Sequence, residues 1–172
     1  MEQKWWTLIA VCVGIFMLLI DITVVNVALP QIQRSLHSSF SDLQWVVNAY
    51  ALTLAALLLT AGSLADLLGR KRVFAAGLIL FTAASLLCGL SSTALMLNLA
   101  RAAQGIGGAT MLATSLALLA QAFRGSDRGT AFAAYGAVIG TLTKKIQRQP
   151  RPEVSAPPTS GPTATAAPIT AP

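Results

Sequence analysis

Apolar residues fill most of this chain in long blocks that only a few polar residues interrupt. Four blocks are long enough to cross a ~30 Å hydrocarbon core as helices, which takes about 20 residues. They run approximately over residues 5–29, 45–65, 73–90 and 94–123. A fifth apolar run covers only the 13 residues 130–142, which reach ~20 Å as a helix. The pattern therefore predicts an all-α membrane protein with four transmembrane helices and an incomplete fifth helix.

The composition agrees with a chain embedded in lipid. Hydrophobic residues make up 55% of the 172 residues and charged residues only 10%, whereas a soluble domain carries about 25% charged residues. The mean hydropathy is +0.67, so the chain has more apolar surface than a core of its own could bury. These values exclude a soluble globular enzyme and a disordered regulator. They make the lipid bilayer the first partner that we expect.

No pattern in the sequence indicates catalysis, a metal site or nucleic-acid binding. The net charge is +6, but no basic stripe interleaved with aromatic residues accompanies it, so we expect no nucleic-acid partner. His37 is the only histidine and is expected in a solvated connection. Cys12 and Cys88 lie inside apolar runs, where a thiol usually behaves as a small hydrophobe. We therefore expect no catalytic residue, no metal and no organic cofactor.

The last part of the chain has a different composition. Seven of the eight prolines lie between Pro150 and Pro172, among alanine, threonine and serine. Such a segment lacks the apolar mass that would offset its chain entropy. We therefore divide the chain into a transmembrane region, residues 1–141, and a disordered Pro/Ala/Thr-rich tail, residues 142–172.

Basic residues concentrate in alternate connections between the predicted helices. Lys4 precedes the first helix, residues 70–72 are all basic, and Arg124 and Arg128 follow the fourth helix, whereas the first connection holds only Arg34. Cytoplasmic loops carry the excess of Lys and Arg in membrane proteins. The sequence therefore predicts a multi-pass protein of the cell membrane with its N-terminus in the cytoplasm, and we expect the tail there too.

Two ionisable residues lie inside the predicted helices, Asp21 in the first and Arg101 in the fourth. A charged group within the bilayer costs at least about 2.5–3.5 kcal/mol on insertion scales, so it normally faces a cavity or a partner. Measured from the outer face, Arg101 lies ~10 Å deep and Asp21 ~6 Å deep. This similarity predicts an Asp21–Arg101 pair or a shared proton or cation site. The alternative is that Asp21 lies close enough to the interface to stay hydrated.

The residues that follow Arg101 combine a polar side chain with small residues. Gln104 lies one helical turn from Arg101, within reach of the same neighbours. Gly105 and Gly107 follow, and Gly105 and Ala109 form a small-xxx-small face of the kind that lets helix backbones approach closely in lipid. We interpret the glycines as packing residues.

The connection between the second and third predicted helices is rich in glycine and charge. Gly62 thins the helix end, and Gly69 can adopt the positive φ that a tight reversal needs. Asp66 can cap the next helix or pair with a basic residue one turn later. The residues of this connection that we single out are Gly62, Asp66, Gly69, Arg70, Lys71 and Arg72.

Three stretches resemble motifs of the drug:proton antiporters of the major facilitator superfamily, especially its fourteen-span multidrug branch. Residues 21–30 (DITVVNVALP) resemble the first-helix motif, residues 62–72 (GSLADLLGRKR) the loop 2–3 motif, and residues 101–107 (RAAQGIG) the fourth-helix motif. Tyr50 also stands where that branch usually has it. The three motifs occur in the expected order, and the resemblance covers residues 1–141.

The resemblance implies the N-terminal part of a proton-coupled exporter of small lipophilic or cationic compounds, which uses a proton gradient and no cofactor. It implies a role in proton coupling for Arg101, with Gln104 beside it, and a role in the substrate or proton path for Asp21. It places Asp66 and Arg70 in a gating latch, although Leu67 replaces the basic residue often found there. We assign the remaining residues of the first-helix motif, Asn26 and Pro30, to helix packing.

The fifth apolar run departs from the antiporter pattern. A Gly-rich segment ending in Gly-Pro should follow residues 137–141, and Leu142-Thr-Lys-Lys stands there instead. We therefore expect a fragment, truncated or frameshifted in the fifth helix. Two alternatives to an exporter by descent stay open. One is a transport-incompetent fragment that acts as a membrane interaction partner, and the other is a small exporter that assembles by self-association.

Overall fold

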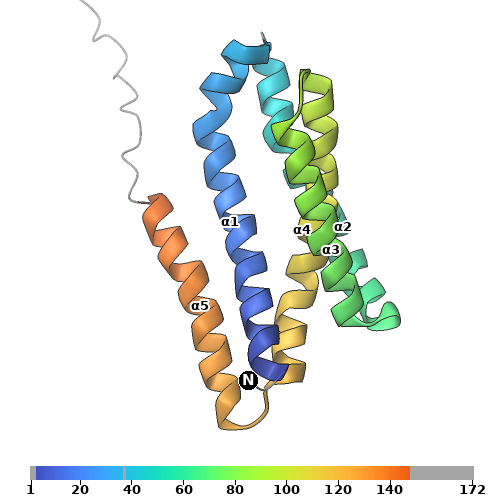
Figure 1. The fold of residues 1–172 in the computed structure, drawn as a ribbon, viewed down its shortest axis with the longest axis vertical. Helices are drawn as coiled ribbons and strands as arrows, with labels where there is room; N and C mark the ends of the chain where they lie inside the picture. The colour runs from blue at the N-terminus through green and yellow to red at the C-terminus, as the bar shows by residue number, and fades with distance from the viewer. Residues whose placement is uncertain (1–2, 37, 148–172) are drawn as a thin grey trace, which may run out of the picture.

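A computed structural model describes residues 3–36 and 38–147 of the chain. His37 and the predicted tail beyond Gln147 lie outside the described residues. The described part contains five helices and no strand (Figure 1). The helices are α1 (Gln3–Leu36), α2 (Phe40–Leu68), α3 (Arg70–Gly89), α4 (Ala94–Ala122) and α5 (Ser126–Gln147). The predicted all-α class is confirmed, and the four helices α1 to α4 are long and apolar enough to cross a membrane.

The helices extend beyond the apolar blocks that predicted them. α1 continues through Pro30 to Leu36, past the predicted end at residue 29. α2 begins at Phe40 because Ser39 and Asp42 form a capping box: the Ser39 hydroxyl accepts from the Asp42 amide at 3.2 Å, and the Ser39 amide donates to the Asp42 carboxylate at 3.0 Å. Such reciprocal bonds satisfy amides that a helix start otherwise leaves unpaired.

α5 is longer than the predicted run over residues 130–142. It begins at Ser126, directly after Gly125 with its positive φ of 63°, and continues to Gln147. The helix therefore continues six residues past the predicted start of the tail at residue 142. The apolar pattern ends earlier than the backbone helix does, since the last turn of a helix carries polar residues without loss of its hydrogen bonds.

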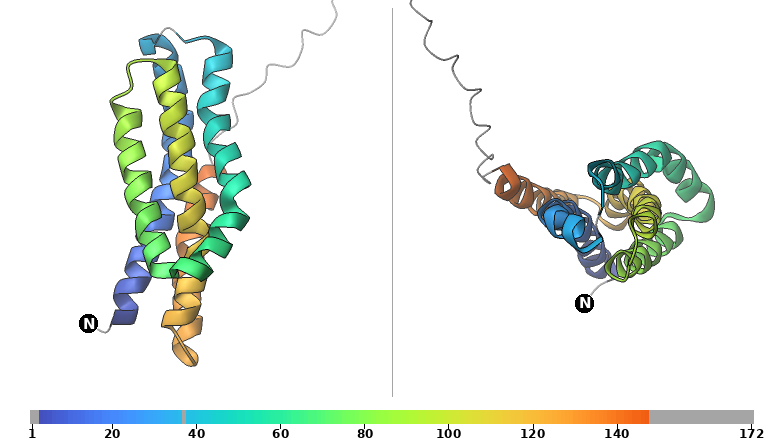
Figure 2. Two further views of the ribbon diagram at one scale, coloured as in Figure 1. Left: turned by 90° about the vertical axis from the view of Figure 1, so that its right-hand side faces the viewer. Right: turned by 90° about the horizontal axis from the view of Figure 1, so that it is seen from above.

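α4 is the central helix of the bundle. It packs against α1, α2, α3 and α5, whereas α5 lies along α1 on the side away from α3 (Figures 1 and 2). A polar contact between α4 and α5 supports this packing, because the Ser115 and Tyr135 hydroxyls are 3.2 Å apart in the interior. At the start of the bundle, Lys4 of α1 forms an ion pair of 2.8 Å with Asp127 of α5.

Glycines on α4 allow its neighbours to approach to backbone contact. A Cβ atom added to Gly107 would lie 2.7 Å from the Phe81 amide nitrogen and 2.8 Å from the Gly77 carbonyl oxygen of α3. A Cβ added to Gly105 would lie 2.6 Å from the Tyr50 carbonyl oxygen of α2. Real Cβ atoms do not occur at such distances, so the predicted packing role of both glycines agrees with the structure.

Asn26 and Pro30 occupy different surroundings from the ones we predicted. Both residues are exposed on α1, and the Asn26 side chain donates to the Ile22 carbonyl of its own helix at 2.9 Å. The described helices give neither residue a packed position, and the packing role stays a prediction. Both lie on the part of α1 beyond its buried residues, the last of which is Leu18.

The helices alternate in direction, so their basic ends meet at one end of the bundle. α1, α3 and α5 begin there and α2 and α4 end there (Figure 1). We call this the basic end, because it carries Lys4, the three basic residues 70–72, Arg124 and Arg128. Arg34 lies near the end of α1, at the opposite end of the bundle. The arrangement matches the alternation that the sequence predicts.

Candidate functional site

The structure brings Asp21 of α1 and Arg101 of α4 into direct contact. The Arg101 Nη1 donates to the Asp21 Oδ2 at 2.6 Å. The Arg101 side chain is 2% exposed and the Asp21 side chain 12% exposed. The predicted pair is therefore present, and the Asp21 carboxylate is largely buried against Arg101. A guanidinium with so little exposure needs such partners, because an unpaired buried charge is strongly unfavourable.

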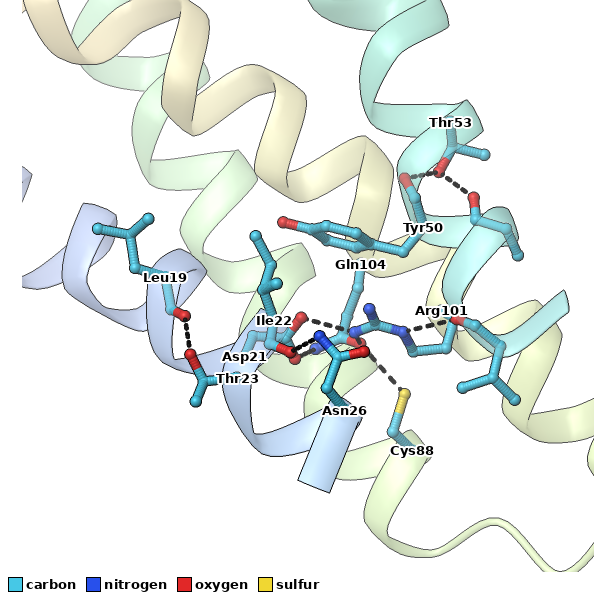
Figure 3. A network of polar contacts seen from close by, with 12 residues as sticks. Leu19, Asp21, Ile22, Thr23, Asn26, Tyr50, Thr53, Cys88, Arg101 and Gln104 are labelled. Atoms are coloured by element: carbon cyan, nitrogen blue, oxygen red, sulfur yellow. Dashed lines mark hydrogen bonds and ion pairs between the residues drawn. The ribbon is translucent and has the colours of Figure 1, made fainter. Parts of the chain in front are cut away.

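Gln104 completes the contact from one turn further along α4. Its Nε2 donates to the Asp21 Oδ1 at 3.0 Å, and its Oε1 accepts from the Arg101 Nη1 at 2.8 Å. The amide thus uses its donor and its acceptor on the two partners of the ion pair (Figure 3). Both oxygens of Asp21 accept a hydrogen bond, so the carboxylate is held in one orientation.

α2 and α3 supply further partners that sequence reasoning missed. The Arg101 Nε donates to the Val46 carbonyl of α2 at 3.1 Å, and the Arg101 guanidinium lies 4.3 Å from the centre of the Tyr50 ring. The Cys88 thiol of α3 donates to the Gln104 Oε1 at 3.2 Å. We call these six residues the polar network. Each of the first four helices contributes to it.

These three partners could not be predicted from the sequence, for a different reason in each case. Val46 acts through its backbone, which no side-chain pattern reveals. Cys88 lies in an apolar run and looks like a small hydrophobe. Tyr50 was recognisable only by its resemblance to the family pattern, because an aromatic residue in a membrane helix most often packs against lipid or other helices.

A small cavity adjoins the polar network. Its volume is about 140 Å³. The lining is mostly apolar and comes from α1, α2 and α4: Ile22, Val25, Asn26, Val47, Tyr50, Ala51 and Arg101. The Asn26 amide provides a polar group at this cavity beside the ion pair (Figure 3). An apolar space with a few placed polar groups is the usual form of a small-molecule site.

The second candidate group lies at the basic end, apart from the polar network. Asp66 accepts from the Arg70 Nε at 3.0 Å and from the Arg70 Nη2 at 2.9 Å, across the α2–α3 turn. Gly69 has a φ of 95° and joins the two helices, as its predicted role requires. Gly62 lies inside α2 with open space around it, which corrects the prediction that it thins a helix end.

The two groups differ in their environment. The side chains of Arg70 and Asp66 are 38% and 63% exposed, and Lys71 and Arg72 are exposed beside them. Water and salt weaken a pair of this kind, whereas the Asp21–Arg101 pair is shielded from both. Within the described residues, no group of three or more His, Cys, Asp or Glu side chains could hold a metal ion.

Comparison with known proteins shows what the chain is similar to. The "Multidrug resistance protein Stp" of Mycobacterium tuberculosis is 45% identical over 140 residues, 80% of this chain and 26% of that protein. The "Puromycin resistance protein pur8" of Streptomyces alboniger is 43% identical over 139 residues, 80% of this chain and 28% of that protein. The "Tetracenomycin C resistance and export protein" of Streptomyces glaucescens is 39% identical over 141 residues, 82% of this chain and 26% of that protein.

The chain thus spans about a quarter of the length of these relatives. The matched region includes the polar network, since the pattern that describes the Major Facilitator Superfamily matches residues 11–142. That range covers well over half of the chain and agrees with the multi-pass helical bundle seen here. The chain belongs to the Major Facilitator Superfamily.

Proposed function

We propose that this chain provides the N-terminal part of a proton-coupled exporter of lipophilic or cationic compounds. The observation that carries the proposal is the polar network, in which a carboxylate and a guanidinium are held together inside membrane helices. Ionisable groups at such positions are expensive and mark substrate or proton paths. The names of three relatives refer to resistance to several drugs, to puromycin and to tetracenomycin C. The third name also refers to export, which supports export as the direction of transport.

Asp21 is the group that would exchange a proton. In the arrangement seen here both of its oxygens accept hydrogen bonds, one from Arg101 and one from Gln104. A proton that adds to one of these oxygens neutralises the carboxylate and removes its attraction for the guanidinium. Arg101 retains the Val46 carbonyl and the Tyr50 ring as partners. Protonation would therefore release α1 from α4 locally while α2 and α4 stay joined.

The cavity beside the network gives the proposed site its preference for apolar molecules. Its volume of about 140 Å³ is smaller than the ~300–1,000 Å³ that usually holds a drug-sized ligand. In transporter folds the substrate site lies where two helical repeats meet, near the middle of the bilayer. We infer that this cavity is the outer part of such a site, since Asp21 beside it lies ~6 Å from the outer face, and that Asn26 contributes a hydrogen bond to the ligand.

The Asp66–Arg70 group would serve as a latch at the basic end. The pair is on the surface and is weak by itself, so it can open and close at little expense of free energy. Lys71 and Arg72 lie beside it. We place this end and the N-terminus in the cytoplasm of the cell, because the positive charges concentrate there.

Reconstitution of the chain into vesicles tests the proposal. Vesicles that carry the 172-residue chain are loaded with a fluorescent cationic dye, and dye release is followed with and without a pH gradient. We expect release that depends on the gradient in the wild type and is lost in Asp21→Asn. Asp42→Asn is the matched control, because it makes the same chemical change at the start of α2, away from the network.

Two results would contradict the proposal. Dye release of equal rate with and without the pH gradient would contradict proton coupling. Absence of dye release would instead favour a transport-incompetent fragment that acts as a membrane interaction partner. Gradient-driven release that appears only in a stable oligomer would instead favour the self-associating exporter. Cross-linking of the reconstituted chain before the dye assay shows whether the chain that releases dye is a monomer or an oligomer.

A further inference from the structure

Two pockets adjoin each other at the basic end, between the first turns of α1 and α3 and the last turns of α4. They have volumes of about 240 and 280 Å³ and share four lining residues, Gln3, Thr7, Lys71 and Leu118. The first pocket adds polar groups from α1 and α4, Lys4 and Gln121 among them. The second adds apolar side chains, including those of Trp6, Val11 and Phe74. One groove thus has a polar half and an apolar half.

The polar half is positively charged. Among the described residues its lining contains two lysines and no carboxylate. Lys4 is engaged with Asp127 at 2.8 Å, so the charge that the groove presents comes chiefly from Lys71. Within the described residues Lys71 forms no ion pair. The first turns of α1 and α3 contain no acidic residue, so the carboxylates nearest to these helix starts are Asp127, paired with Lys4, and Asp66, paired with Arg70.

The apolar half has the position of a lipid contact. Trp6 is 60% exposed at the start of α1, and tryptophan side chains concentrate at the membrane interface. Val11 is buried one turn deeper, and Phe74 packs in the core from α3. The groove therefore runs from a basic rim at headgroup level toward an apolar wall at the level of the acyl chains.

We propose that this groove binds an anionic phospholipid, with the phosphate at Lys71 and an acyl chain along Trp6 and Phe74. Basic pockets between membrane helices bind anionic headgroups in this way. An anionic amphiphile matches both halves of the groove, whereas a soluble anion would use only the polar half. The inference does not rest on the polar network, because the groove lies at the basic end, beside the proposed latch.

Quenching of Trp6 fluorescence by brominated lipids tests the proposal. The chain has three tryptophans, so Trp5→Phe with Trp45→Phe leaves Trp6 as the reporter. The protein is reconstituted in equimolar phosphatidylglycerol and phosphatidylcholine, with bromine on the acyl chains of one lipid or the other. The two quenching curves give the association constant of phosphatidylglycerol relative to phosphatidylcholine at this groove.

Variants at neighbouring basic positions sharpen the test. We expect Lys71→Ala to lower the relative association constant about fivefold, the factor that corresponds to one lysine near an anionic surface. Lys71→Arg should stay within about twofold of the wild type, since it retains the charge. Arg72→Ala is the matched control, because Arg72 is exposed and does not line the groove. Far-UV circular dichroism verifies that all variants retain their helix content.

Each remaining outcome overturns the proposal. Equal quenching by both lipids would show a groove without headgroup preference. Equal losses in Lys71→Ala and Arg72→Ala would show diffuse surface charge instead of a site. Absence of quenching by either lipid would show that protein covers the groove. Displacement of phosphatidylglycerol by inorganic phosphate, but not by chloride of equal ionic strength, would assign the polar half to free phosphate.

Discussion

Replacement of Asp21 by Asn and of Arg101 by Met, singly and together, measures how strongly the polar network couples α1 to α4. Asn keeps the size of Asp21 and removes its charge, and Met keeps much of the length of Arg101 and removes its donors. The two side chains are 12% and 2% exposed, so solvent screens their attraction little. The free energy of unfolding of the four proteins, wild type included, forms a double-mutant cycle.

The structure predicts unequal effects for the two single changes. Arg101→Met leaves the Asp21 carboxylate with Gln104 as its remaining partner and also removes the donor to Val46. Breaking a buried pair in this way costs about 3–5 kcal/mol. Asp21→Asn leaves the Arg101 charge without a counter-charge but with two oxygen acceptors and the Tyr50 ring, so we expect a loss at the lower end of that range, about 3 kcal/mol.

The double variant should lose less stability than the sum of the single variants. Neither charge is then left without its partner, and residues in one network show coupling energies of about 0.5–3 kcal/mol. Unfolding in mixed micelles by increasing dodecyl sulfate, followed by far-UV circular dichroism, gives the four free energies. Additive losses, within about 0.5 kcal/mol, would refute the argument that the pair acts as a buried unit.

A surface pair in the same chain is the matched control for this cycle. Asp66 and Arg70 are in contact at 2.9 Å, but their side chains are 63% and 38% exposed. Exposed ion pairs contribute about 0–1 kcal/mol. The cycle of Asp66→Asn and Arg70→Met should therefore show almost no coupling. Equal coupling in both cycles would mean that burial is not the cause of the effect.

Three further predictions concern the packing of the bundle. Gly107→Ala should lower the free energy of unfolding in the same dodecyl sulfate titration by about 1–3 kcal/mol, because the added Cβ meets backbone atoms of α3. Gly136→Ala is its control, because a Cβ at that position enters open space and should leave this free energy unchanged or slightly raised. Tyr135→Phe should lower that free energy by about 0.5–1.5 kcal/mol through loss of the contact with Ser115. Asp127→Asn removes a half-exposed ion pair, so its effect should stay below about 1 kcal/mol and vanish in thermal unfolding at 1 M salt.

The number and order of the membrane helices could be predicted from the sequence, because a run of about 20 apolar residues is a strong signal. Their ends could not. α1 continues to Leu36 through polar residues beyond Pro30, and α5 continues to Gln147 through residues that we assigned to the tail. Backbone hydrogen bonds carry a helix past its apolar positions, and a count of apolar residues does not register them.

The contact between Asp21 and Arg101 in the polar network was predictable from the depth of the two residues in the bilayer alone. Two opposite charges at similar depth in a bilayer are expected to meet, which led to Asp21 and Arg101, and helical spacing added Gln104. The roles of Val46, Tyr50 and Cys88 depend on how each helix is rotated about its axis. Helices that are apolar all round carry no periodic pattern that would indicate this rotation.

The packing residues and the polar residues of α4 depend on each other in the structure, although the sequence suggests separate roles for them. Arg101 reaches the Val46 carbonyl at 3.1 Å only because α2 lies against α4 at backbone distance. That distance exists because Gly105 has no Cβ, which would otherwise lie 2.6 Å from the Tyr50 carbonyl oxygen. Tyr50 in turn places its ring 4.3 Å from the Arg101 guanidinium. A residue larger than glycine at position 105 would therefore displace the partners of the buried charge, since the surrounding interior is close-packed and transmits the strain.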